Sequence, residues 1–288
     1  MALDYLVIGH ATLDAVRGSR ALGGTAAYAA RTARALGCKV GVVTSVGPNL
    51  DPSQSLGDVQ LERVRAPTST VFENVYLDTG RRQVIHSVAA PLTLETVPEG
   101  WTAQVVHVGP VAGECDPALV TGFEGAFIGV TPQGWMRTWD DAGYVGPRRW
   151  KESSQVLPHA DAVVLSEEDV RGDEGTVVEY ARETGCLALT QGAAGCTIYA
   201  GGEIRRLPAP NVDEVDPTGA GDIFAASFFY ALQRGHDPWV AARFANCIAA
   251  RSVTRQGLCG TPLDEEVAYC RRLATIGEGD DAHYLRAG

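Results

Sequence analysis

The chain has 288 residues, of which 45% are hydrophobic and 20% are charged, and its formal net charge is −11. This balance supplies enough apolar surface for a sizeable folded core, so disorder is not the expectation for the body of the chain. An acidic surface repels phosphate backbones and anionic lipids, which excludes nucleic acid and membranes as main partners.

The cysteines and the start of the chain indicate the compartment. The seven cysteines contain no C-x-x-C pair, and their spacing fits neither a zinc site nor a disulfide framework. The first residues, MALDYLVIGHATLD, carry polar groups too early for a signal peptide. No apolar run approaches the roughly 20 residues that a membrane span needs. We therefore expect a soluble, cytoplasmic protein with reduced, mostly buried thiols.

Short β-branched runs alternate with helical patterns along the chain. The predicted buried strands are Leu3–Ile8, Val40–Thr44, Val105–Val108, Ala126–Val130, Ala162–Leu165 and Leu187–Thr190. Helical periodicity appears at Gly24–Leu36, Glu174–Glu183, Ile223–Arg234, Trp239–Thr254 and Leu263–Ala274. This alternation predicts an α/β fold with a mainly parallel central sheet.

One early segment departs from this pattern. Thr68–Leu77 and Arg82–Val88 resemble strands, and Asp78-Thr79-Gly80 between them is a hairpin turn signal. The insertion near residues 66–90 is either a lid over the mouth of the sheet or an ordinary edge hairpin. No linker divides the chain, so residues 1–276 are predicted to form a single domain. Residues 277–288 are polar and aperiodic and are predicted to be a flexible tail.

A glycine-containing loop precedes one of the predicted helices. The string Asp-Pro-Thr-Gly-Ala-Gly-Asp, residues 216–222, leads directly into the apolar helix that starts at Ile223. The free N–H groups and the dipole of a helix N-terminus favour an anion. Because Gly219 and Gly221 lack a Cβ, a phosphate can approach their main chain closely.

Asp222 stands at the end of this loop, beside the predicted anion pocket. Phosphoryl transfer depends on positioning and charge neutralisation, and it needs a base within reach of the attacking hydroxyl. A carboxylate here can serve as that base. An Asp that only caps the helix is the alternative, since Asp is common at helix N-termini.

The string from Asp216 to Asp222, followed by an apolar helix, resembles the C-terminal signature of the ribokinase-like carbohydrate kinases, also called the PfkB family. The resemblance runs from about Leu3 to Leu273. It implies a ribokinase-like three-layer α/β/α fold with a small β-hairpin lid, and ATP-dependent phosphorylation of a hydroxyl on a small sugar or polyol. Mg²⁺ is the implied cofactor, whereas dependence on K⁺ is left open, as is the choice between monomer and homodimer.

The resemblance also assigns roles to individual residues. Asp222 would be the base, with the N–H groups of Gly219, Ala220 and Gly221 as anion hole and Arg137 on the transferring phosphate. The acceptor would be bound by Asp14, Gly23, Gly24, Tyr28 and Gln133. The nucleotide would lie along Thr190, Gly192, Gly195, Thr218 and Asn246. The metal would lie near Asp216 and either Asp169 or Glu168. A helix-surface Asn and a surface Arg are the alternatives for Asn246 and Arg137.

Two positions depart from the family pattern. Where many relatives carry Asn-x-x-Glu near the metal, this chain has Ser166-Glu167-Glu168-Asp169. Where ribokinases and fructokinases usually offer an Asn to the sugar, this chain has Tyr28, which disfavours a furanose. Tyr28, the segment around Gln133 and Arg137, and the Thr70-x-Phe72-x-Asn74-x-Tyr76 string look most like the inositol-kinase-like branch.

Other classes fit less well. The chain lacks the Walker string Gly-x4-Gly-Lys-Ser/Thr, the Gly-x-Gly-x-x-Gly of dinucleotide-binding dehydrogenases and the His-Glu-x-x-His of zinc hydrolases. Two alternatives stay open. One is a nucleoside kinase on the same fold, with Phe72, Tyr76 and Trp135 as walls for a base. The other is a regulator that binds nucleotide or sugar without phosphoryl transfer.

Overall fold

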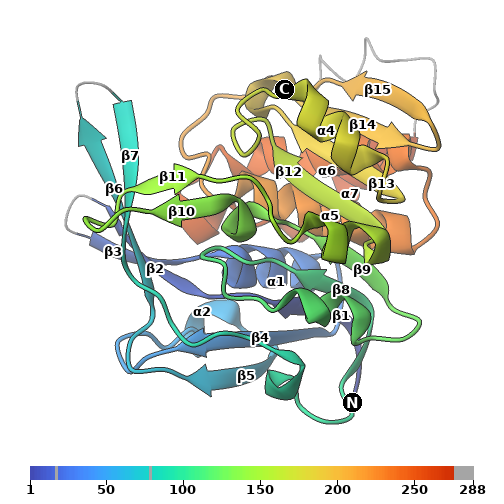
Figure 1. Cartoon of the computed structure of the whole chain (residues 1–288). Helices are drawn as coiled ribbons and strands as arrows, with labels where there is room; N and C mark the ends of the chain where they lie inside the picture. Colours follow the sequence, from blue (N-terminus) through green and yellow to red (C-terminus); the bar gives the residue numbers. More distant parts are fainter. Residues whose placement is uncertain (17–18, 78–79, 276–288) are drawn as a thin grey trace.

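A nine-stranded sheet forms the centre of the computed structural model, which describes residues 1–16, 19–77 and 80–275 (Figure 1). The strand order is β15-β14-β13-β12-β9-β8-β1-β4-β5. The pairings from β5 to β13 are parallel, and β14 and β15 extend one edge in antiparallel fashion. The bounds are β1 Ala2–Ile8, β4 Val40–Val46, β5 Gln60–Arg65, β8 Thr102–Val108, β9 Phe127–Val130, β12 Ala162–Ser166, β13 Cys186–Thr190, β14 Cys196–Ala200 and β15 Glu203–Leu207.

Helices cover both faces of this sheet (Figure 1). One face carries α1 Thr25–Ala35, α5 Ala220–Gln233, α6 Pro238–Ser252 and α7 Asp264–Thr275, with α2 Ser53–Leu56 beside α1. The other face carries α3 Ser153–Val156 and α4 Glu174–Ala181. The 3₁₀ helices are η1 Leu94–Thr96, η2 Pro117–Thr121, η3 Gln133–Met136, η4 Leu157–His159, η5 Gly192–Ala194 and η6 Gly257–Gly260.

The apolar runs of the strands explain the layers. Side chains alternate between the faces of a strand, so a strand buried on both faces needs apolar residues at every position. Within β4, Val42 packs into the core under α1 and α5, and Val43 packs into the core on the opposite face. Val7 and Ile8 of β1 divide in the same way. These two cores make the predicted three-layer α/β/α fold.

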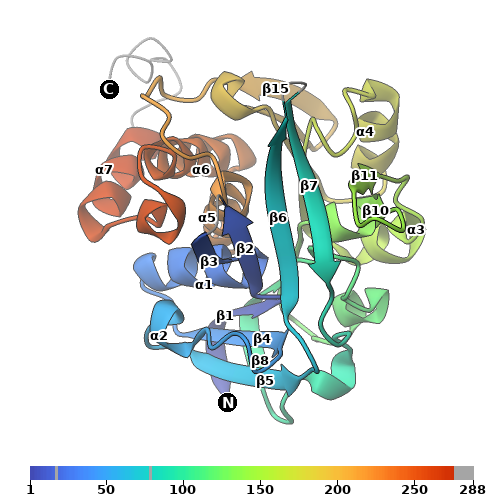
Figure 2. The same ribbon diagram turned by 90° about the vertical axis from the view of Figure 1, so that its left-hand side faces the viewer.

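A second sheet, with order β3-β2-β6-β7, stands at one side of the molecule (Figure 2). The expected hairpin forms β6 Thr70–Leu77 and β7 Gly80–Ser87, while its turn residues Asp78 and Thr79 lie outside the described residues. Two further strands, β2 Thr12–Val16 and β3 Ser19–Gly23, complete the sheet and were not expected. We call this four-stranded sheet the lid, while its closing over the mouth of the central sheet stays a prediction. It is larger than the predicted hairpin and carries Asp14 within β2.

A short hairpin, β10 Arg137–Trp139 and β11 Val145–Pro147, lies next to the lid. Sequence patterns did not predict it, because each strand has only three residues. The strands β5 and β15 at the two edges of the sheet were also missed, since their exposed positions break the apolar runs, and β14 beside β15 was missed as well.

The cysteines differ in part from the prediction. Cys38, Cys115, Cys186 and Cys196 are buried free thiols, as expected. Cys247 of α6 and Cys270 of α7, however, are joined by a disulfide, so the prediction was wrong for this pair. Their sequence separation of 23 residues gives no hint that the packing of α6 on α7 brings them together. Among the described residues, no helix is both long and apolar enough to span a bilayer.

Candidate active site

The glycine loop enters α5 through a left-handed turn at Gly219. This residue has φ +80°, a conformation that a residue with a side chain adopts only at a cost. The loop before it is held by Asp216, whose carboxylate accepts hydrogen bonds from Thr218 N at 3.0 Å and Gly257 N at 2.9 Å. The carboxylate of Asp216 therefore joins the glycine loop to η6, and its predicted place near the metal stays a prediction.

The start of α5 presents open main-chain donors. In the described part of the chain, the N–H groups of Gly219, Gly221 and Asp222 have no main-chain acceptor, whereas Ala220 N donates to Pro217 O at 3.2 Å. Open donors at a helix N-terminus are suited to bind an anion, as predicted for this loop. The open donors include Asp222 N, which was not predicted, and they do not include Ala220 N, which was predicted.

The Asp222 carboxyl group is fixed by a residue that sequence reasoning missed. Thr25, the first residue of α1, donates its hydroxyl to Asp222 Oδ1 at 2.7 Å. Helices α1 and α5 pack together (Figure 1). This packing brings the side chains of Thr25 and Asp222 within hydrogen-bond distance. The sequence signal was the position of Thr25 directly after Gly23-Gly24, at a helix start.

Charges around Asp222 come from several of the predicted site residues. Burial is the main cause that raises the pKa of Asp222 from 3.8 to about 6. Asp14 and Asp169 raise this pKa further, and Arg137 and the Thr25 hydrogen bond lower it. The lid strand β2, the end of β12 and the β10–β11 hairpin thus all bring charges close to one carboxyl group.

The predicted acceptor side of the site is shaped around Asp14. Thr12 Oγ1 donates to Asp14 Oδ1 at 2.8 Å, and a Cβ on Gly23 would lie 2.2 Å from Asp14 Oδ2. A side chain at position 23 would therefore displace the carboxylate. Gly24 has φ +81°, and a Cβ there would lie 2.3 Å from His10 O. Gly23 therefore leaves room for the Asp14 carboxylate, and Gly24 allows the main chain of His10, which follows β1, to lie close to it.

Tyr28 packs against the glycine loop. Its side chain is 2% exposed, and a Cβ on Gly219 would lie 2.3 Å from Tyr28 Cδ1. The ring therefore packs directly under the glycine loop. Burial, followed by the charges of Asp14, Asp216 and Asp222, raises the pKa of the Tyr28 hydroxyl. The ring supports the anion hole, while its predicted contact with the acceptor stays a prediction.

Gln133 is the first residue of η3 and Arg137 directly follows its end. The start of η3 is tied to the loop after β8 by Gly134 N, which donates to Pro110 O at 2.8 Å. That loop is held by a buried carboxylate that was not predicted. Glu114 is 4% exposed and accepts hydrogen bonds from the N–H groups of His10, Val111 and Ala112, at 2.7–3.0 Å. The Glu114 carboxylate thereby joins the ends of β1 and β8 beneath the predicted acceptor side. The sequence of this loop contains no pattern that predicts this role for Glu114.

His10, which follows β1, ties the same region to the root of the lid. Its ring nitrogens lie 2.7 Å from Thr70 Oγ1 and 2.9 Å from Ala90 O. Thr70 Oγ1 also accepts a hydrogen bond from Ala89 N at 3.0 Å. The start of β6 and the segment that follows β7 are thus both bonded to the residue after β1.

The two candidate metal residues differ in their surroundings. Asp169 Oδ2 accepts hydrogen bonds from the N–H and the hydroxyl of Ser166, each at 2.9 Å, and its charge reaches Asp222. Glu168 is exposed. No cluster of three or more His, Cys, Asp or Glu side chains that could hold a metal occurs in the described ranges. Mg²⁺ keeps several waters and needs only one or two carboxylates, so this site fits Mg²⁺ through Asp169.

Three of the predicted nucleotide residues lie together, Thr190 at the end of β13 and Gly192 and Gly195 in the turn before β14, whereas Thr218 lies in the glycine loop and Asn246 in α6. Glu167 N donates to Thr190 O at 3.0 Å, which places Thr190 beside the Asp169 turn. Gly192 has φ +56° and Gly195 has φ +95°, so the turn between β13 and β14 depends on glycine. Asn246 is 4% exposed and its amide donates to Leu207 O at 3.0 Å. Its side chain holds β15 in place, and its contact with adenine stays a prediction.

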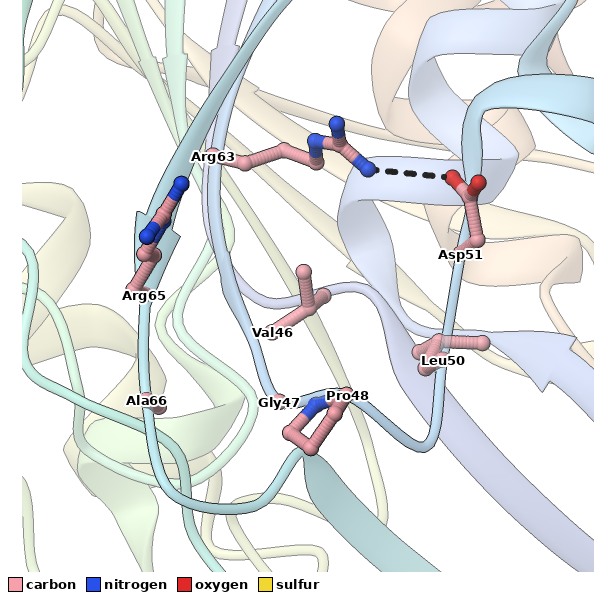
Figure 3. Close-up of a pocket in the computed structure, with 8 residues that line it drawn as sticks. All are labelled: Val46, Gly47, Pro48, Leu50, Asp51, Arg63, Arg65 and Ala66. Atoms are coloured by element: carbon pink, nitrogen blue, oxygen red, sulfur yellow. Dashed lines mark hydrogen bonds and ion pairs between the residues drawn. The ribbon is translucent and has the colours of Figure 1, made fainter.

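A separate pocket of about 610 Å³ lies between the loop after β4 and strand β5 (Figure 3). Arg63 and Asp51 form an exposed ion pair of 3.3 Å across it, which contributes little to stability. None of the predicted site residues lines this pocket. Its loop is nevertheless linked to the root of the lid, since Gly47 N donates to Ser69 Oγ at 3.0 Å.

Comparison with known proteins agrees with this arrangement. Residues 142–265 match the model of the pfkB family carbohydrate kinases, and these residues include Asp222 and its glycine loop. The chain contains a pfkB family carbohydrate kinase domain. The kinase family expected from the glycine loop is thereby confirmed.

Curated relatives of this domain are kinases with different acceptors. A cytidine kinase of Thermococcus kodakarensis is 26% identical over 257 residues, which are 81% of this chain and 90% of that protein. An inositol 3-kinase of Zea mays is 30% identical over 205 residues, which are 70% of this chain. The match spans only 47% of the maize protein's length.

Solved structures confirm the ribokinase-like fold. A pyrophosphate-dependent kinase in the ribokinase family, complexed with a pyrophosphate analog and myo-inositol, superposes with a TM-score of 0.76 at 23% identity. That match covers 92% of this chain and 99% of the other. A sugar kinase of Pyrococcus horikoshii in complex with ATP has a TM-score of 0.75 at 21% identity, covering 94% of this chain and 99% of its own.

Proposed function

We propose that this protein transfers a phosphoryl group from ATP to a hydroxyl of a small sugar or polyol, with an inositol-like ring as the favoured acceptor. The observation that carries the proposal is the Asp222 carboxyl group, held by Thr25 at 2.7 Å beside the open N–H groups of α5. A base and an anion-binding site at the same place are what transfer to a hydroxyl requires.

In this mechanism the acceptor hydroxyl lies between Asp14 and Asp222. Asp222 takes the hydroxyl proton as the oxygen bonds to the γ-phosphorus, and the bond from that phosphorus to the β–γ bridging oxygen breaks, releasing ADP. The N–H groups of Gly219, Gly221 and Asp222 receive charge on the transferred group, and Arg137 supplies a bidentate partner. A pKa of about 6 leaves Asp222 mostly unprotonated at neutral pH yet more basic than an ordinary carboxylate.

Mg²⁺ would be held through water by Asp169, with Glu168 as the more exposed alternative. When bound, it would neutralise charge on the phosphates of the donor. Such neutralisation is necessary because the protein has a formal net charge of −11 and would otherwise repel the negatively charged ATP.

The aromatic side chains favour a polyol over a nucleoside. A nucleoside kinase needs an apolar wall for the base, and Phe72 and Trp135 were the candidates. Phe72 is 4% exposed and packs with Ile85, whereas Trp135 is 2% exposed and stacks on Trp150 at 5.8 Å between ring centroids. Both rings are occupied by the protein's own core, and the side chain of Tyr76 lies outside the described residues.

The test is nucleoside diphosphate release with a panel of inositols, hexoses, pentoses and nucleosides, measured for the wild type and for Asp222→Asn. ATP and pyrophosphate are supplied in parallel as donors, because pyrophosphate would yield orthophosphate instead of ADP. Wild-type turnover with a polyol is expected, and the variant should lose roughly 10²–10⁴-fold in kcat with nearly unchanged ATP affinity.

Other outcomes would change the proposal in specific ways. A wild type that binds ATP and polyol but never turns over would be a regulator. Preference for cytidine or another nucleoside would favour the nucleoside-kinase alternative. Near-normal turnover in Asp222→Asn would show that another group is the base.

A further inference from the structure

A buried histidine lies in the central sheet and has no part in the reaction as described so far. His107 belongs to β8 and is fully buried, and Phe229 of α5 packs edge-on against its ring, with 5.0 Å between the ring centroids. Burial lowers the pKa of His107 to about 3. The ring is therefore neutral at physiological pH, and only one of its two nitrogens carries a proton.

His107 is the middle member of a polar row that crosses three strands. Tyr5 Oη lies 3.2 Å from His107 Nδ1, and Thr131 Oγ1 lies 3.0 Å from His107 Nε2. In the sheet register, Val7 and Gly129 are the neighbours of His107. Tyr5 and Thr131 lie two residues away from these neighbours, so both side chains project from the same face as the imidazole. This is the face that α1 and α5 cover.

The row ends beside the proposed base. Thr131 directly follows β9, and its N–H donates to Val108 O at 3.1 Å, as a further residue of the strand would. A Cβ on Gly109 would lie 2.9 Å from Thr131 Oγ1 and 2.3 Å from Thr25 Cγ2. The hydroxyl of the same Thr25 holds Asp222 at 2.7 Å. The Thr131 hydroxyl and the Thr25–Asp222 pair therefore lie around one point, at the carboxyl end of β8.

The protons of the row fix the direction of its hydrogen bonds. Within residues 1–16, 19–77 and 80–275, the buried Tyr5 hydroxyl has His107 Nδ1 as its only hydrogen-bond partner. A buried O–H without an acceptor is costly, so Tyr5 donates and Nδ1 accepts. The single proton of the neutral imidazole is then on Nε2, which donates to Thr131 Oγ1.

This direction leaves one proton of the row unused. Thr131 accepts from His107, and in the described part of the chain its own O–H has no acceptor. The side chain is 7% exposed, so bulk water does not readily supply one. Gln133 and Arg137, two of the predicted site residues, follow it within six positions. A donor that is this buried and stands beside Asp222 is suited to an oxygen of a ligand.

We propose that the Thr131 hydroxyl is a further substrate-binding group, which donates its proton to an oxygen of the acceptor beside the hydroxyl that Asp222 deprotonates. Tyr5 and His107 are positioning residues, since they reach the acceptor only through Thr131. The inference rests on the proposed phosphoryl transfer. Its consequence is that the acceptor carries two neighbouring oxygens, as an inositol-like ring does.

The first test uses Thr131→Val, which keeps the shape of the side chain and removes the hydroxyl, with Thr131→Ser as the matched control. Myo-inositol is the acceptor, and its Kd is measured by calorimetry beside the kinetic constants. We expect Thr131→Val to raise the KM and the Kd for myo-inositol roughly tenfold, with the KM for ATP nearly unchanged, and Thr131→Ser to stay within about twofold of the wild type.

An unchanged KM and Kd for myo-inositol in Thr131→Val would overturn the proposal, because a trapped water would then be the partner of the hydroxyl. Equal weakening of ATP and myo-inositol binding would also overturn it, since the hydroxyl would then support the fold and not the acceptor. Weaker binding in Thr131→Val, found with a wild type that never turns over, would contradict only the proposed phosphoryl transfer. A wild type that does not bind myo-inositol would overturn the assignment.

The direction of the hydrogen bonds has a test of its own, which needs no turnover. NMR of the ring nitrogens distinguishes the two neutral forms of histidine, and we expect His107 to carry its proton on Nε2 at neutral pH. Tyr5→Phe, which should shift mainly the Nδ1 signal of His107, identifies this ring among the six histidines. A proton on Nδ1 would overturn the proposal, because Thr131 would then donate to His107 and have no proton for a ligand.

Discussion

The donor side and the acceptor side of the candidate site are built in different ways. The donor side comes from one continuous run, Asp216 to Asp222, whose left-handed glycine and helix start follow directly from local sequence. The acceptor side draws on Asp14 in the lid and Glu114 after β8, while Thr25 in α1 and Arg137 in the β10–β11 hairpin act on Asp222 from outside the loop. Only the tertiary fold brings these residues together.

This difference has a physical consequence. A site formed by consecutive residues needs a particular backbone conformation, so its weak points are glycines and the rings that pack against them. A site formed by distant residues needs the bonds that join separate loops, so its weak points are buried polar groups. Substitutions should therefore act differently on the two sides.

The largest effect is expected on the donor side, from Gly219→Ala. The new methyl group would meet the Tyr28 ring at 2.3 Å in a backbone conformation that disfavours alanine. We expect a loss of about 3 kcal/mol in the free energy of unfolding, measured by urea denaturation, together with loss of ATP binding. Gly221→Ala is the matched control, because a Cβ there meets nothing within 4 Å. Equal stability of the two variants would mean that the Tyr28 ring does not fix the loop.

Asp222→Asn should increase the stability at high pH, in contrast to the loss expected for Gly219→Ala. The folded-state pKa of about 6 lies above the ordinary 3.8, so Asp222 favours folding below the ordinary pKa, and this contribution is lost as the pH rises through 6. Asn carries no charge yet can still accept the Thr25 hydrogen bond. At pH 8 we expect the variant to be more stable than the wild type by about 2 kcal/mol, with the difference shrinking towards pH 4. Thermal denaturation across this pH range measures it, and a gain that persists at pH 4 would exclude the carboxyl charge as its cause.

On the acceptor side, Glu114→Gln tests the bonds that join separate loops. An amide NH₂ would replace one of the oxygens that now accept from His10, Val111 and Ala112, leaving a buried N–H facing another donor. The expected loss is about 1–3 kcal/mol in the free energy of unfolding, with a raised KM for the acceptor and an unchanged KM for ATP. The exposed Glu124→Gln serves as control. A raised KM for ATP instead would place Glu114 in support of the donor side.

The smallest effect is expected from the pair Asp169→Asn and Glu168→Gln, which separates the two candidate metal residues. Asp169 is held by Ser166 and acts on Asp222, whereas Glu168 is exposed. Asp169→Asn should raise the Mg²⁺ concentration for half-maximal activity by roughly tenfold, and Glu168→Gln by about twofold or less. The reverse order would assign the metal to Glu168.

The sequence allowed good prediction of the donor side and of the buried sheet. The Asp216–Asp222 string and the apolar strands carry their structure locally, so β1, β4, β8, β9, β12 and β13 appear near their predicted bounds. Thr25, Glu114 and the disulfide between Cys247 and Cys270 were missed, because their partners are distant in sequence. Strands β2 and β3 were missed for a related reason. They are stable only as part of a sheet whose centre, β6, lies some fifty residues further along the chain.

The place of the β10–β11 hairpin next to the lid also bears on how two copies of this protein could associate. Strand β7 is the last strand of its sheet, and an unprotected sheet edge invites a strand from another molecule. Here the Ile85 amide of β7 already donates to Gly143 O, in the turn of the β10–β11 hairpin. A second copy adding a strand at this edge would have to displace that turn, and β3 is the end of the sheet where such an addition would not disturb it.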